Sequence, residues 1–126
     1  MTFQFFNDRL APSVESQPLA ELHHWRVLAR GNGDRHLTAQ MDSGTLRVTS
    51  KLQCMEVSRG IVRTESGRSY KLCAPPEEDE QLRTLIELNA LRSLQTIIGE
   101  ESHAIWDAVK AGDWPAERVA LLPPPQ

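Results

Sequence analysis

Apolar and polar residues alternate in short runs between residues 24 and 73, and turn-forming residues interrupt these runs at intervals of roughly 8 to 12 positions. Residues 24–30 and 36–41 each place an apolar side chain at every second position, which is the period of a half-buried strand. The glycine-containing segments 31–34 and 42–44 suit the tight turns that would follow them. The pattern predicts an antiparallel meander of five or six strands.

Two more segments extend the predicted β unit. In residues 46–52 apolar side chains alternate with arginine, threonine and lysine, so we expect a half-buried strand whose wet face is cationic. Residues 61–72 predict a hairpin with Ser-Gly at its turn, because β-forming residues lie on both arms. Its Thr-x-Ser-Gly-Arg-x-Tyr-x-Leu pattern, over residues 64–72, resembles a hairpin of small bacterial proteins. That resemblance implies no particular activity.

The hydrophobic period changes to three and four residues after Pro75 and Pro76. These prolines end the β region because proline has no backbone N–H to donate to a sheet. We expect a long helix over residues 77–98 with acidic residues in its first turn, and a shorter helix over 101–110 packed beside it as an antiparallel pair. A further helical turn is expected within 113–122. The predicted apolar face of the long helix consists of Leu82, Leu85, Ile86, Leu88, Leu91, Leu94, Ile97 and Ile98.

Together these elements predict one α+β domain over residues 1–126. Its parts are an N-terminal arm (1–22), a β unit (23–73) and a helical unit (77–122). The β unit is expected to be a small antiparallel β-meander or an SH3-like barrel of five or six strands, with a flat sheet as the alternative, followed by two or three C-terminal helices. The long helix is expected to be the main cover of the core.

Charge is distributed unevenly along the chain. Residues 23–73 contain nine Lys and Arg against four Asp and Glu, whereas residues 74–126 contain four against ten. The outward sides of the strands are therefore expected to be basic, and such a face attracts acidic partners. The alternative is that basic strands and acidic helices neutralise each other within the fold. The expected basic strand face consists of Arg26, Arg30, Arg47, Lys51, Arg63, Arg68 and Lys71.

Two surfaces are candidates for binding a partner. Phe3, Phe5 and Phe6 are the only phenylalanines of the chain, and each ring buries of order 150 to 250 Å² when it is covered. The arm is therefore expected to pack on an edge of its own fold or on another chain. The second candidate surface is the basic strand face, from which the predicted partner-binding residues are Arg47, Lys51, Arg63, Arg68 and Lys71.

No motif for catalysis, a cofactor or a metal is recognisable in the sequence. The four histidines and two cysteines lack the C-x-x-C and H-x-x-x-H spacings, and the adjacent His23 and His24 are expected to point to opposite faces of a strand. The Gly31-x-Gly33 segment lacks the third glycine and the following helix of a phosphate loop, and no serine stands in a G-x-S-x-G turn. We therefore expect no catalytic residue, no cofactor and no metal.

These observations predict a small bacterial-type, non-enzymatic module that binds a protein or associates with itself as a homodimer. An alternative is a nucleic-acid-associated accessory or regulatory factor, which the net charge of −3 and the lack of aromatic residues among the basic positions disfavour. A second alternative is an enzyme without a recognisable motif. The apolar runs are shorter than the roughly 18 residues of a membrane span, and the N-terminal residues lack the pattern of a signal peptide, so we expect a cytoplasmic protein without a membrane partner.

Overall fold

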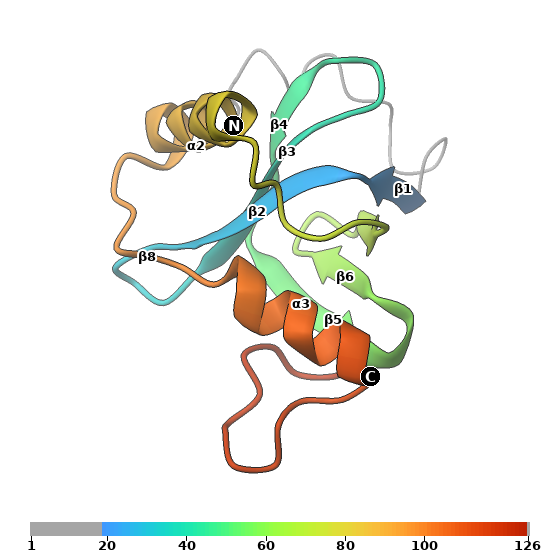
Figure 1. Ribbon diagram of the computed structural model, residues 1–126. Helices are drawn as coiled ribbons and strands as arrows, with labels where there is room; N and C mark the ends of the chain where they lie inside the picture. The colour runs from blue at the N-terminus through green and yellow to red at the C-terminus, as the bar shows by residue number, and fades with distance from the viewer. Residues whose placement is uncertain (1–18, 126) are drawn as a thin grey trace.

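The strands of this protein divide between two sheets (Figure 1). The structure, a computed structural model, describes residues 19–125. One four-stranded sheet has the order β1-β7-β6-β5, and the other has the order β4-β3-β2-β8. The strands of the first sheet are β1 (Leu19–Leu22), β5 (Leu52–Glu56), β6 (Ile61–Thr64) and β7 (Ser69–Leu72). Those of the second are β2 (His24–Ala29), β3 (Arg35–Gln40), β4 (Leu46–Val48) and β8 (Gly99–Glu100).

The α+β class, the antiparallel hairpins and the C-terminal helices are confirmed. Six strands, β2 to β7, lie within residues 24–72, and turns at the predicted positions join β2 to β3, β3 to β4 and β6 to β7. The SH3-like barrel is not confirmed, because the strands are divided between two separate sheets. The pattern also missed β1, which lies in the predicted arm and pairs in parallel with β7, and the short β8.

The strand predicted over residues 46–52 was wrong in its bounds and in its facing. The structure splits this segment into β4 and the start of β5, which belong to different sheets. Arg47 is buried while Val48 is half-buried, the reverse of the prediction. Val48 packs on a small apolar cluster under helix α2 (Glu80–Leu94), whereas Nη1 of Arg47 donates to the Tyr70 hydroxyl at 3.5 Å. Both faces of this sheet are covered, so polarity alone did not identify the inner one.

The main core lies between the two sheets and helix α3 (Ser102–Ala111), which packs against β2 and the short 3-10 helix η1 (Val57–Arg59). Trp25 has no exposed surface, and its ring meets Trp106 edge to face with centroids 6.2 Å apart. The predicted inward face of residues 24–41 is confirmed by the buried Trp25, Val27, Leu37 and Ala39. Alternation therefore identified one face of the second sheet correctly.

Helix α2 covers the other face of the second sheet. The prediction that this helix is the main cover of the core was therefore wrong. The helix begins later than expected, after the N-cap Asp79, whose side chain accepts a hydrogen bond from the Leu82 N–H, and it ends at Leu94. The expected antiparallel helix pair was wrong, because β8 lies between α2 and α3 in the chain and Figure 1 shows the two helices at opposite ends of the fold. Residues 113–122 contain no helix.

Candidate protein-docking groove

Helix α2 exposes three leucines that the sequence pattern predicted to be buried. Leu85, Leu88 and Leu91 are 47%, 54% and 44% exposed, and we call them the leucine stripe. The opposite row of the helix, Ile86, Ala90 and Leu94, is buried against the sheet. Asn89 is buried on the same side, so the covered face of the helix has spacings of three and four, and the leucine stripe lies outside it.

A groove of about 430 Å³ runs beside the leucine stripe, between α2 and the segment around β8. Its apolar part is lined by Leu28, Leu88, Leu91 and Ile97. A groove of this size, with apolar walls and a few polar groups, is typical of a binding site. The neighbouring Ile98 is 73% exposed, so the apolar surface continues past the groove.

A buried arginine fixes the charged end of this groove. Arg26 of β2 is 1% exposed, and its Nη1 donates to the Glu77 carbonyl at 3.0 Å. Its Nη2 lies 3.1 Å from the Glu100 carboxylate, and Glu87 lies 3.4 Å from its Nε in an ion pair without hydrogen-bond geometry. One guanidinium therefore connects β2, α2, β8 and the segment that precedes α2.

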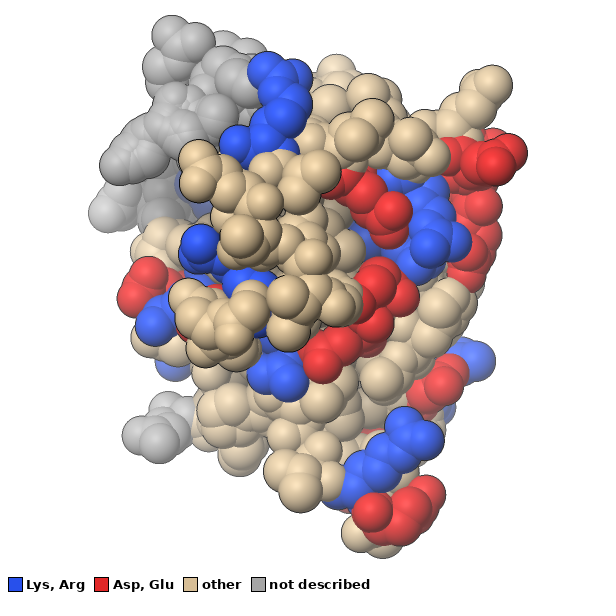
Figure 2. Space-filling model, turned by 90° about the vertical axis from the view of Figure 1, so that its left-hand side faces the viewer, with Lys and Arg blue, Asp and Glu red and all other residues tan. Residues whose placement is uncertain are grey.

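The outer layer of this network contains more carboxylates than guanidinium groups. Arg83 lies 3.3 Å from Glu87 and 3.7 Å from Glu78, and Glu78 is also 3.6 Å from Arg26 and 2.5 Å from Nε2 of His103. Figure 2 shows that acidic and basic side chains are interleaved on this face, around apolar surface. The face therefore lacks the continuous positive field that a nucleic-acid backbone requires.

The predicted basic strand face is only partly present. Arg47 and Arg68 are buried, so their expected outward position was wrong, as it was for Arg26. Lys51, Arg63 and Lys71 are exposed, in agreement with the prediction. Two nearby acids weaken this face, because Lys51 lies 3.6 Å from Glu65 and Lys71 is opposite Glu21 on the neighbouring strand. The predicted aromatic positions, Phe3, Phe5 and Phe6, lie outside the described residues.

The groove was not predicted, although the sequence contains one signal for it. The long helix had eight apolar positions on its predicted face, more than one layer of sheet can cover. No family model matches the chain, and no curated protein and no solved structure is significantly similar to it. Within residues 19–125 no helix has both the length and the apolar composition to cross a membrane.

Proposed function

We propose that this protein is a non-enzymatic protein-binding module that binds a second copy of itself through the leucine stripe of α2. The observation that carries the proposal is the exposure of Leu85, Leu88 and Leu91 beside an apolar groove. Three half-exposed leucines on one helix form a continuous apolar surface, and such surfaces usually mark sites of association. The burial of Arg47 and Arg68 favours this surface over the basic strand face as the docking site.

The charges at the two ends of α2 favour an antiparallel pairing of two copies. The first turn of the helix contains Glu80 and the last turn contains Arg92. An interface with twofold symmetry brings each residue of one copy against the symmetry-related position of the other. A twofold axis beside Leu88 would place Leu85 of one copy against Leu91 of the second copy, and each acidic helix start beside a basic helix end. The helix dipoles also oppose each other in this arrangement.

The buried Arg26 makes the docking surface a preformed one in the unbound protein. Arg26 connects the sheet to the residues on both sides of the groove, Glu87 on α2 and Glu100 on β8. A preformed surface loses less conformational entropy on binding than a loose one, which favours association. The stripe spans about 9 Å along the helix, at a rise of about 1.5 Å per residue. This length suits a contact between two short helices, with the groove and Ile98 extending it at the side.

The proposal is tested by light-scattering mass at several protein concentrations, comparing the wild-type chain with Leu88→Asp. We expect a concentration-dependent dimer for the wild type. A charge at the centre of the stripe should weaken the dimer at least about 30-fold, since a central apolar anchor typically contributes 2 kcal/mol or more to binding. Leu88 is half-exposed, so the variant should retain the wild-type circular dichroism spectrum.

A matched control comes from another exposed apolar residue. Val119 is 90% exposed and lies outside the groove, so Val119→Asp introduces the same charge without reaching the stripe and should leave the dimer intact. A charge reversal at one end, Glu80→Arg, should weaken the dimer, and adding Arg92→Glu should restore it. A monomeric wild-type protein at every concentration overturns the proposal. A dimer that survives Leu88→Asp overturns it as well, because the contact then lies elsewhere.

A further inference from the structure

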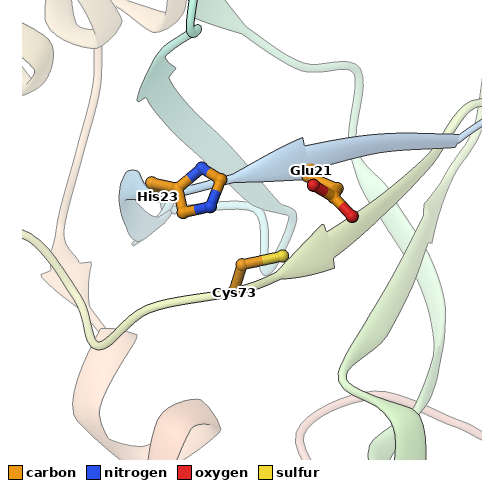
Figure 3. Close-up of side chains that lie close together, drawn as sticks. All are labelled: Glu21, His23 and Cys73. Carbon is orange, nitrogen blue, oxygen red and sulfur yellow. The ribbon is translucent and has the colours of Figure 1, made fainter.

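The parallel pairing of β1 with β7 brings together three residues that are far apart in the sequence. Leu22 pairs with Leu72, and the residues that follow them are His23 and Cys73. The Cys73 N–H donates to the Leu22 carbonyl at 2.9 Å, which holds these two segments of the chain together. Glu21 is in β1, and His23 is the bend residue between β1 and β2. Figure 3 shows Glu21, His23 and Cys73 side by side.

The ligand atoms of these three side chains lie within 4.8 Å of one another. In a tetrahedral zinc site, bonds of about 2.0 Å to nitrogen and about 2.3 Å to sulfur place those two donors roughly 3.5 Å apart. The donors must therefore approach by about 1 Å, which side-chain rotation accomplishes because Glu21 and His23 are exposed. The backbone already has the arrangement that a shared ion requires.

A fourth residue lies beside the imidazole. The Asp42 carboxylate lies 3.4 Å from Nδ1 of His23. In Figure 3 the other ring nitrogen is on the side of the Cys73 sulfur. Metal-binding histidines usually give one nitrogen to the ion and the other to a carboxylate or carbonyl, which fixes the tautomer and the direction of the ring. Asp42 supplies that outer partner from the turn between β3 and β4.

We infer that Glu21, His23 and Cys73 bind a divalent transition metal of the zinc type, with Asp42 holding the His23 ring in place. The donor set identifies the class of ion. Thiolate and imidazole ligands with one carboxylate suit zinc, whereas calcium and magnesium select sites made of oxygen. Three protein ligands leave one tetrahedral position for water or an external ligand.

Proton release is a consequence of this assignment. Burial raises the pKa of the Cys73 thiol, and the Glu21 and Asp42 carboxylates raise it further, while Lys71 and the backbone hydrogen bond with Leu22 offset part of the effect. The thiolate is the metal ligand, so binding of the ion displaces the thiol proton. One proton leaves as one metal–sulfur bond forms, and no electron is transferred.

This site is independent of the docking groove. Figure 1 shows β1 on the opposite side of the fold from α2 and β8. No metal was expected from the sequence, because its possible donors lack the short spacings of common metal motifs. Glu21 and His23 are two residues apart, but Cys73 is 50 residues after His23, directly after β7, and meets them only through the parallel pairing. Metal binding therefore goes beyond the proposed self-association and does not depend on it.

The test is a cobalt titration of the reduced, full-length protein carrying no histidine tag. Cobalt(II) occupies zinc sites, and its bond to a thiolate produces a charge-transfer absorption band. We expect saturable absorption at one cobalt per chain, lost on adding one equivalent of zinc. Cys73→Ser should abolish the band, and His23→Gln should weaken cobalt binding at least tenfold. The substitution Asp42→Asn should weaken it about tenfold, as expected for an outer partner.

Cys54 provides the matched control because it is the only other cysteine and is buried in β5. Cys54→Ser should keep the cobalt band if the variant folds, and circular dichroism checks each variant. His23→Gln changes an exposed side chain, so the test remains decisive even if a cysteine variant unfolds. The inference is overturned if the wild type shows no thiolate band. It is also overturned if the folded Cys73→Ser or His23→Gln variant binds cobalt like the wild type.

Discussion

Replacing the buried arginine of the ion-pair network should destabilise the whole fold. Arg26→Met keeps most of the side-chain length and removes the guanidinium, which is 1% exposed and contacts carboxylates on α2 and β8. The substitution leaves Glu87 and Glu100 close together without the positive charge between them. It also leaves the Glu77 carbonyl without its donor. We therefore expect α2 to be held less firmly on the second sheet.

The expected loss is about 3 kcal/mol, near the lower end of the range for breaking a buried ion pair. The bond to the Glu77 carbonyl and the 3.1 Å contact with Glu100 supply most of it, because hydrogen bonds to charged groups contribute roughly 1.5 to 3 kcal/mol each. The carboxylates of Glu87 and Glu100 are 30% and 29% exposed, so water compensates part of the loss. A loss of this size is large beside the 5 to 15 kcal/mol total of a typical domain, on the order of one third.

The assay is urea unfolding followed by circular dichroism, at one fixed protein concentration because self-association would couple to stability. Arg59→Met is the matched control, since Arg59 is 67% exposed and should change the free energy of unfolding by less than about 0.5 kcal/mol. Arg26→Lys should be intermediate, because one ammonium cannot bridge the same partners. A loss below about 1 kcal/mol for Arg26→Met would refute the reasoning and show that the network adds little to the fold.

Two further predictions concern buried polar groups of the second sheet and α3. Burial lowers the pKa of His36, an effect that its hydrogen bond to the Thr49 carbonyl only partly offsets, so the unfolded chain takes up the proton first. Urea midpoints should therefore fall as the pH is lowered from about 7.5 to about 5.5, through the ordinary histidine pKa of about 6.5. The His36→Gln variant should show a smaller fall. An equal fall in the wild type and the variant would contradict this prediction. Ser102→Ala removes the hydroxyl that accepts from the Val27 N–H at 2.8 Å, and should cost about 1 to 3 kcal/mol in urea unfolding because that N–H remains buried. The exposed Ser58→Ala is its control, and equal midpoints for the two variants would contradict the prediction.

Local patterns were sufficient to predict much of the fold. The period of two in residues 24–30 and 36–41 identified β2, β3 and their inner face, because side chains alternate across any strand whatever it pairs with. Glycine turns located the hairpins for a similarly local reason, since Gly33, Gly44 and Gly67 each adopt a positive φ that other residues resist. These features depend on neighbouring residues alone.

The candidate sites depend on contacts between distant segments, and the pattern could not predict them. Arginine is polar, so Arg26, Arg47 and Arg68 were assigned to the outside, yet all three are buried. The partners of Arg26 and Arg47 come from other elements of the fold. The exposed face of α2 was also not predictable from the pattern. Its apolar face was recognised in the sequence, but which leucines stay in water depends on how the helix rests on the sheet.

The amino-acid sequence by itself determined the class of fold, most strands, the two helices and the uneven distribution of charge. Only the tertiary structure decided which strands share a sheet, and it thereby placed Cys73 beside His23 and left Leu88 exposed. The physical reason is the range of the forces involved. Periodicity and turns express steric constraints between near neighbours. Sheet pairing and helix packing are selected by the burial of the whole chain, and no local pattern contains that information.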